Sequence, residues 1–406
     1  MESTMTRHPE RLFKMDESET RRPRMRKAPL YVMLGLGTVY LWVMMQSASS
    51  LEQAKNTYLL MGTQVEITVV APRNKQPEAL VEGAYREMKK MESLFNYYDP
   101  NSFVSRLNAL PAGTPLKVQE GEEVVMDVLG TARQISELSD GAFDITFATV
   151  GKFWRFDPEN PSLPTEEELA SVRGKIDYRN VVVDRAAGTV MLKGEGTKIN
   201  LGGIAKGSAV DRAILYLVNK GAKGALVNAG GDMYAMGYKI DPNRDKSDEE
   251  IAPELQQGLK QYSERYPDAE EIPEGMAPWV IGLQHPRDKE SILPEGGFEM
   301  PSNMAVVTSG DYERMFEFEG KRYSHTINPK TGMPVSGLVS VSVFAQSAEY
   351  ADALATAFTV MGPEKGPELA RKLSGVEALF ITEKTEVIHT NGIPDELKSI
   401  ELKPTK

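Results

Sequence analysis

The chain has 406 residues, of which 47 are Lys or Arg and 58 are Asp or Glu, so its formal net charge is −11. Hydrophobic residues make up 41% of it, which excludes a largely disordered protein, and the acidic balance argues against a nucleic-acid-binding surface. With no cysteine and only four histidines, disulfides, thiolate metal sites and cysteine nucleophiles are excluded. A bound metal ion would therefore be a hard cation such as Mg²⁺ or Ca²⁺ on oxygen ligands.

The amino-terminal region carries a membrane signal. Residues 28–45 form an uncharged, mostly apolar run of 18 residues, near the lower limit for a membrane-spanning helix. The cations within residues 21–27 favour a cytoplasmic position for the basic leader, 1–27. We therefore expect an exported domain, 46–406, behind a segment that is either a signal anchor or a cleaved signal peptide. The expected location is the periplasmic side of the cell inner membrane.

Helical and strand patterns follow each other without regular βαβ alternation. Apolar spacing predicts helices at 77–95, 121–139, about 203–219, 349–361 and 363–373. Strands are predicted at about 58–70 with a break at the glycine, as a pair within 180–200, at 225–228, just past 231, at 279–283, at 338–345 and as a final pair near 377–388. This mixture predicts an α+β fold in one large globular unit.

The segment 241–275 differs in composition from its surroundings. It contains eleven acidic and four basic residues, and so holds −7 of the net charge of −11. We expect an acidic surface insertion, and a solvated loop is favoured over an arm that docks a partner.

Two glycine-containing segments follow predicted strands. In the first, residues 200–207 (NLGGIAKG), glycines at a strand-to-helix junction let the backbone approach a phosphate, and Lys206 adds a positive charge. A purely structural turn is the alternative. In the second, residues 228–232 (NAGGD), the double glycine predicts either a tight turn or a close approach of backbone to a ligand.

His325 lies in a dense polar loop. The segments 309–314 (SGDYER) and 324–332 (SHTINPKTG) flank it, and Asn-Pro and Thr-Gly in the second mark a rigid turn. A lone histidine beside such a turn is often structural, but His325 is the natural candidate for a general base.

Asp352 and Thr356 are four residues apart in the segment 349–357 (EYADALATA). On a helix their oxygens lie on one face, one turn apart. A carboxylate and a hydroxyl, completed by backbone carbonyls and water, suit Mg²⁺ bound to a pyrophosphate. Helix capping by Asp352 alone is the alternative.

Taken together and in this order, the segments resemble the ApbE family, the FAD:protein FMN transferases. The resemblance covers about 58–380 and rests on MGT at 61–63, GAFD at 141–144 and the segments quoted above. It implies a single large ApbE-like, T-fold-related domain behind the membrane segment. It also implies Mg²⁺-dependent transfer of the FMN moiety of FAD to a Thr or Ser hydroxyl of a target protein, with release of AMP.

The resemblance assigns roles to individual residues. It places the metal on Asp352, Thr356 and the backbone carbonyl of Gly203. It gives His325 the role of accepting the hydroxyl proton, and Lys206 that of neutralising the phosphates. The FAD contacts that it implies are Met61, Tyr98, Ala142, Phe143, Asp144, Asn200, Lys206 and Ile327.

Three positions depart from the family pattern. Asn200 and Asn328 stand where relatives usually have Asp, and Ala355 where some have a further metal-binding carboxylate. These departures leave two alternatives open: an exported FAD-binding or flavin-storage protein without transferase activity, or an FAD pyrophosphatase. The expected partners are FAD, the membrane and a target protein such as a subunit of a membrane electron-transport complex.

Overall fold

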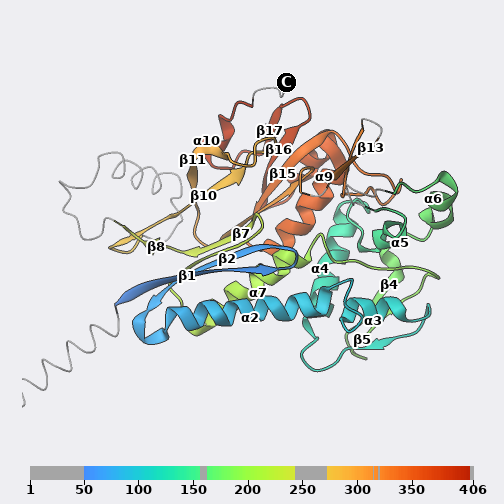
Figure 1. Ribbon diagram of the computed structural model, residues 1–406, viewed down its shortest axis with the longest axis horizontal. Coiled ribbons are helices and arrows are strands. Elements are labelled where there is room, and N and C mark those ends of the chain that lie inside the picture. Colours follow the sequence, from blue (N-terminus) through green and yellow to red (C-terminus); the bar gives the residue numbers. More distant parts are fainter. Residues whose placement is uncertain (1–49, 156–161, 243–271, 314, 319–320, 403–406) are drawn as a thin grey trace, which may run out of the picture. The chain divides into compact units, whose positions relative to one another are not determined.

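An antiparallel sheet organises the described part of the chain (Figure 1). The computed structural model describes residues 50–155, 162–242, 272–313, 315–318 and 321–402, all within one compact unit, Ser49–Lys406. Within these residues eight strands pair antiparallel in one sheet. Their order across the sheet is β1 (Leu51–Leu60), β2 (Thr63–Pro72), β6 (Gly224–Ala229), β7 (Asp232–Gly237), β12 (Met304–Gly310), β15 (Leu338–Ala345), β16 (Glu377–Thr382) and β17 (Val387–His389).

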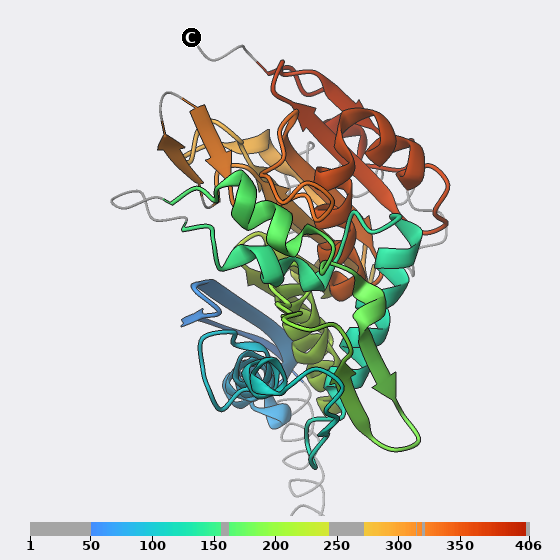
Figure 2. The ribbon, with the colours of Figure 1, turned by 90° about the vertical axis from the view of Figure 1, so that its right-hand side faces the viewer.

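Helices cover one face of this sheet. Helix α9 packs on the central strands β12 and β15, and α7 lies between α9 and α2. Figure 2 looks along α2, which lies beside the β1–β2 hairpin and α7. The bounds of the four helices are α2 (Pro77–Phe95), α4 (Val124–Leu138), α7 (Ala205–Lys220) and α9 (Ala348–Ala370). Their apolar faces and that of the sheet form the main core.

A second, smaller layer covers the other face. The hairpin β10 (Trp279–Gln284) and β11 (Ile292–Met300) and the short α10 (Asp395–Lys398) contribute apolar side chains to it. Phe298 of the hairpin meets Phe344 of β15 edge to face, with 6.0 Å between the ring centroids. Every residue of β15 is buried, because both faces of the sheet are covered there.

The remaining elements are short. A three-stranded sheet in the order β3–β5–β4 lies beside α4, and two further strand pairs, β8–β9 and β13–β14, are separate. The bounds are α3 (Phe103–Ala109), β3 (Leu116–Lys117), α5 (Ala148–Gly151), α6 (Glu166–Arg173), β4 (Val181–Asp184), β5 (Thr189–Leu192), β8 (Lys239–Ile240), β9 (Met276–Ala277), β13 (Met315–Phe318) and β14 (Lys321–Ser324), with 3-10 turns at Arg73–Lys75, Ile145–Phe147 and Tyr178–Asn180.

The mixed helix-and-sheet fold expected from the sequence is confirmed. The predicted helix 77–95 and strand 338–345 match α2 and β15 residue for residue, and a non-helical Gly362 breaks α9 between the two helices predicted there. The glycine break predicted within the strand 58–70 is a reversal of the chain at Met61 and Gly62, both with positive φ, so the segment belongs to the two strands of the β1–β2 hairpin.

Strand β12 was missed, although it is central. Its sequence, MAVVTSG, is a short apolar run without period-two alternation, because β12 lies between two strands and under both layers. The predicted leader 1–27 and membrane segment 28–45, and most of the acidic segment 241–275, lie outside the described residues. Among the helices that the structure describes, none combines the length and apolar character needed to span a membrane.

Candidate active site

The two glycine segments predicted separately from the sequence meet at the start of α7. Strand β6 ends in the turn Gly230–Gly231, where φ is 64° and 98°, and β7 begins directly at Asp232. Lys206 lies in the first turn of α7, and its Nζ is 3.0 Å from Oδ2 of Asp232. The Asp232 side chain is fully buried. The tight turn therefore places a buried carboxylate against the lysine of the GGIAKG segment.

Helix α9 meets α7 at Gly207, as Figure 1 shows for the two ribbons. The N–H of Gly207 donates a hydrogen bond of 3.0 Å to Oδ2 of Asp352. A Cβ added to Gly207 would lie 2.1 Å from the carbonyl oxygen of Ala348, closer than any real contact. Only glycine lets the two helices approach this closely, and the approach brings Asp352 beside Lys206.

Gly203, Thr356 and Phe143 are neighbours. A Cβ added to Gly203 would lie 2.9 Å from Oγ1 of Thr356 and 3.3 Å from the ring of Phe143. Thr356 follows Asp352 by four residues on α9, and therefore shares its helix face. The structure thus brings together the three residues assigned to the metal, and places them next to the FAD segment 142–144.

Lys206, Asp232, Asp352 and Glu313 form one charged group, in which the pKa values of the first three depend on the charges of their neighbours. Burial disfavours the Lys206 ammonium, but the carboxylates of Asp232, Glu313 and Asp352 outweigh this effect and raise the pKa of Lys206 above its ordinary value. Burial raises the pKa of Asp232, while Lys206 opposes the shift. Burial and the charge of Asp232 raise the pKa of Asp352 well above the usual aspartate range.

This group fits a hard divalent cation. Three carboxylates stand against one ammonium, and both buried oxygens of Asp232 lack a hydrogen bond of regular geometry within the described residues. A cation would reduce the excess negative charge, and oxygen donors are those that Mg²⁺ prefers. Across the described ranges no group of three or more His, Asp or Glu side chains is arranged to hold a metal by itself. Backbone, water or substrate oxygens must therefore complete the shell.

The predicted FAD contacts Met61 and Tyr98 lie on two loops that are linked. The N–H of Met61, in the β1–β2 turn, donates to Oε1 of Glu92 in the last turns of α2, at 2.6 Å. Tyr98 follows the end of α2, and is 84% exposed. The same β1–β2 turn lies beside the turn before Asp232, because the N–H of Gly230 donates to the carbonyl of Gln64. The Tyr98 ring meets the ring of Tyr97 edge to face, with 5.4 Å between the centroids, and is otherwise exposed.

Segment 142–144 is held from within. Ala142 and Phe143 are buried, and the Asp144 carboxylate accepts hydrogen bonds from the N–H and hydroxyl of Thr146 and from the N–H of Tyr178, at 2.6–2.8 Å. Burial raises the pKa of Asp144, and these hydrogen bonds oppose the shift. The carboxylate therefore shapes the loop, which makes Asp144 a poor candidate for a general base.

The two asparagines that replace the usual Asp are turn formers. Oδ1 of Asn200 accepts the N–H of Gly202 at 2.7 Å, and Oδ1 of Asn328 accepts the N–H of Lys330 at 2.9 Å. An aspartate oxygen would make the same bonds. The substitutions therefore preserve the turns while removing two negative charges.

The loop that carries His325 is fastened at two points. The indole N–H of Trp154 donates to the carbonyl of Gly332 at 2.9 Å, and Nζ of Lys330 lies 2.7 Å from Asp140, just before segment 142–144. Ile327 is 5% exposed, in a small apolar cluster with Trp154. Its side chain thus anchors the loop that carries the half-buried His325.

Sequence reasoning missed two members of the group. Asp232 stood in the NAGGD segment and Glu313 in SGDYER, but neither was assigned a role. The signal that was available is a carboxylate placed directly after a tight turn or at the end of a central strand. The proximity of Asp232 and Glu313 to Lys206 depends on the β6–β7 and β7–β12 strand pairings, which were not predicted from the sequence.

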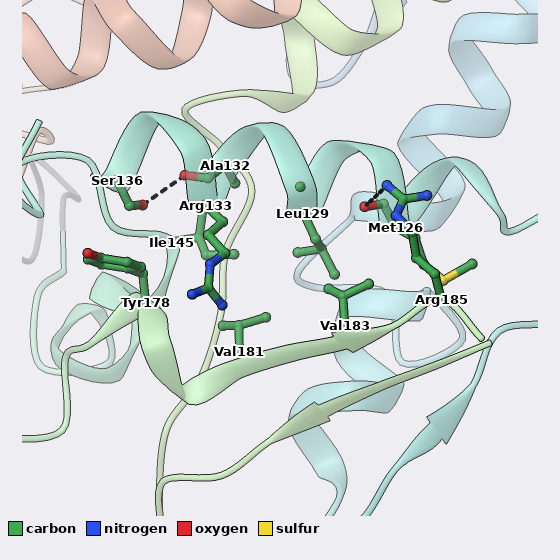
Figure 3. A pocket seen from close by; sticks show the side chains of 11 residues that line it. Met126, Leu129, Ala132, Arg133, Ser136, Ile145, Tyr178, Val181, Val183 and Arg185 are labelled. Atoms are coloured by element: carbon green, nitrogen blue, oxygen red, sulfur yellow. Dashed lines mark hydrogen bonds between the residues drawn. The ribbon is translucent and has the colours of Figure 1, made fainter. Parts of the chain in front are cut away.

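A separate cavity of about 340 Å³ lies between α4 and β4 (Figure 3). Leu129, Val181 and Val183 point into it, and Arg133 and Arg185 stand at its sides. None of the site residues predicted from the sequence lines this cavity. It adjoins segment 142–144 through Ile145, which follows Asp144 in the chain, and through Tyr178, whose N–H donates to Asp144.

The chain is similar to known proteins in both sequence and fold. The ApbE family model matches residues 61–380. A protein of Treponema pallidum named FAD:protein FMN transferase is 30% identical over 359 residues, covering 84% of this chain and 88% of its own. The crystal structure of the ApbE protein of Thermotoga maritima superposes with a TM-score of 0.68 at 30% identity, covering 87% of this chain and all of that one. A flavinyl transferase ApbE of Pseudomonas stutzeri, in its apo form, gives 0.67 at 27% identity, with 87% and 98% covered.

These relatives and superposed structures define the class of protein as a flavin transferase. The chain belongs to the ApbE family.

Asp352→Asn should change how stability depends on pH in the metal-free protein. Because the folded-state pKa of Asp352 is raised, the folded state holds its proton to higher pH than the unfolded chain, whose aspartates titrate near ~3.9. Stability is therefore lost as the pH rises through the folded pKa. Asparagine does not ionise, so the melting temperature of Asp352→Asn minus that of wild type, measured in EDTA, should increase from pH 4.5 to 7.5.

The matched control is Glu120→Gln, since the Glu120 side chain is exposed in the loop before α4. Its difference from wild type should stay constant over this range. A constant difference for Asp352→Asn as well would show that the carboxylate carries no burial penalty.

Proposed function

We propose that this protein transfers the FMN moiety of FAD to a Thr or Ser hydroxyl of a target protein, with release of AMP. The observation that carries the proposal is the group at the α7–α9 contact, where Lys206, Asp352 and Gly203 meet the buried segment 142–144. Two relatives named FAD:protein FMN transferase each match this chain over more than four-fifths of its length. Both lines of support point to the same chemistry.

Different residues of the chain would have different roles in phosphoryl transfer. Lys206 neutralises charge on the bridging phosphates from the first turn of α7, at the positive end of the helix dipole. Asp352, Thr356 and the Gly203 carbonyl would hold Mg²⁺, which when bound supplies electrostatic stabilisation of the phosphoryl oxygens. Segment 142–144 and the β1–β2 turn position the flavin half.

His325 handles the proton. As the acceptor oxygen forms its bond to the FMN phosphorus, the phosphorus–oxygen bond to AMP breaks, and AMP leaves with the electron pair. The hydroxyl proton passes to the His325 imidazole. A hydroxyl is a poor nucleophile without such a base. Asp311 is not suited to this role, because it forms a bidentate pair of 2.7 and 2.9 Å with Arg287.

Ala355 bears on the alternative functions. Because the residue is an alanine, α9 offers no second carboxylate at that position, and its side chain is fully buried. Asp232 and Glu313 keep the group negative nonetheless, which favours an active enzyme over an FAD-storage protein. Hydrolysis of FAD to FMN and AMP uses the same group with water as acceptor, and is kept as the second candidate.

The function is tested by incubating the purified protein with FAD and Mg²⁺, with and without an acceptor domain, and measuring AMP and covalently bound flavin. We expect acceptor-dependent AMP release with an FMN mass added to the acceptor. Asp352→Ala should abolish both while the circular dichroism spectrum is retained. AMP release that is independent of acceptor would identify a pyrophosphatase, and FAD binding without AMP would identify a storage protein.

His325→Ala should slow FMN transfer by about 10²–10⁴-fold, the usual contribution of a general base, and leave FAD affinity nearly unchanged. Transfer under single-turnover conditions and FAD binding by fluorescence separate the two effects. His389→Ala is the control, since His389 lies on β17 away from the motifs. A loss of FAD binding with normal transfer at saturating FAD would instead make His325 a ligand-positioning residue.

We further propose that residues 28–45 hold the protein at the inner membrane with residues 46–406 on the periplasmic side. The cations within residues 21–27 support this orientation. A reporter that is active only in the cytoplasm, fused to the carboxyl terminus, should be silent, whereas a periplasmic reporter at the same position should be active. The reverse pattern would contradict the topology.

A further inference from the structure

Asp211 is a half-buried carboxylate on α7 to which the reaction described above gives no role. It lies four residues after Gly207, and therefore on the face of α7 that meets α9. Its three hydrogen bonds all go to the first residues of α9. Oδ2 accepts the hydroxyl of Ser347 at 2.7 Å and the N–H of Glu349 at 3.0 Å, and Oδ1 accepts the N–H of Ala348 at 2.8 Å.

These bonds complete the amino-terminal cap of α9. Ser347 is the N-cap residue, and its Oγ accepts the N–H of Tyr350 at 3.1 Å. The two amides before that one have no carbonyl partner within their own helix, and a carboxylate from a different helix satisfies both. A negative charge at this end of a helix is also favourable. The cap therefore depends on α7 as much as on α9.

The geometry of the cap sets the position of Asp352 and Thr356 on α9 relative to the start of α7. Asp352 begins the next turn of α9 after these capped residues, and Thr356 follows one turn later. Gly203 and Lys206 stand at the start of α7, the helix that supplies Asp211. Two contacts, at Gly207 and at Asp211, thus set the position of α9 along α7. Sliding α9 by one residue, about 1.5 Å, would move Asp352 and Thr356 away from Gly203.

We propose that Asp211 is a positioning residue, which holds the metal-binding face of α9 in place against the start of α7. The inference rests on the proposed function, because it concerns the site that this function uses. Groups that orient metal ligands from outside typically contribute 10- to 100-fold to metal affinity. Loss of Asp211 should therefore weaken Mg²⁺ binding more than it slows the reaction at saturating Mg²⁺.

The test compares Asp211→Ala, Asp211→Asn and Ser347→Ala with wild type. The first removes all three bonds to Asp211, and the second keeps one acceptor oxygen at the same size. The third removes one of the three bonds to Asp211, together with the cap bond between Ser347 and Tyr350. We expect the Mg²⁺ concentration for half-maximal AMP release to rise in the order Ser347→Ala, Asp211→Asn, Asp211→Ala, reaching about tenfold or more in the last. The turnover number at saturating Mg²⁺ should fall less than about threefold, by the same reasoning that the ligands themselves are intact.

A second readout does not depend on activity. The rise in melting temperature on adding Mg²⁺ should shrink in the same order. Leu217→Ala is the matched control, because it removes a fully buried side chain from α7 without touching the cap. It should lower the melting temperature and leave the Mg²⁺ requirement unchanged.

Unchanged Mg²⁺ constants in the folded Asp211 variants would overturn the proposal and leave the function intact. An equal rise in Leu217→Ala would also overturn it, since general destabilisation would then explain the effect. A wild-type protein that shows neither AMP release nor a thermal response to Mg²⁺ would overturn the proposed function together with this inference.

Discussion

The close contact between α7 and α9 is the constraint on which the site depends. Backbone meets backbone at Gly207, where the carbonyl of Ala348 occupies the space of a side chain. A helix pair normally stands 8–10 Å apart, and a glycine at the crossing permits the lower end of this range. The consequence is electrostatic: buried Asp352 receives an amide N–H from α7 and lies within range of Lys206 and Asp232.

The α7–α9 contact also affects the ionisation of Lys206, Asp232 and Asp352, because it brings Asp352 close to the other two side chains. Burial alone would neutralise Asp232 and Asp352 by raising their pKa values, and would deprotonate Lys206. Lys206 opposes the shift at both aspartates, while the charge of Asp232 adds to the shift at Asp352, so a bound cation would stabilise the ionised form of Asp352. A substrate with a pyrophosphate needs both signs in one place, one for the metal and one for the phosphates. The sheet supplies them from β7 and the helices from α7 and α9.

Most of the site could be predicted from the sequence, because its parts are local. Asp352 and Thr356 share a helix face by spacing alone, and the glycines of GGIAKG mark a helix start. Proximity among separate segments could not be predicted in this way. The strand β12 was missed, and with it the pairing that brings β7 next to the motifs around Glu313. Asp211 was missed because a capping carboxylate from another helix leaves no periodic signal.

The departures from the family pattern also needed the structure. Asn200 and Asn328 looked like losses of charge at the site, but their side-chain oxygens accept backbone hydrogen bonds within tight turns. The role that they keep is geometric. Asp144 and Ile327, both expected to contact FAD, are buried, and their side chains hold the backbone of their own loops.

The central claim is that one metal ion lies where α7 and α9 meet. Crystals soaked with FAD and Mn²⁺, measured at the manganese absorption edge, locate the ion directly. The account predicts one anomalous peak at coordination distance, about 2.0–2.2 Å, from the Asp352 carboxylate, with phosphate density between it and Lys206. A strong peak elsewhere, with neither ion nor phosphate beside Asp352, would contradict it.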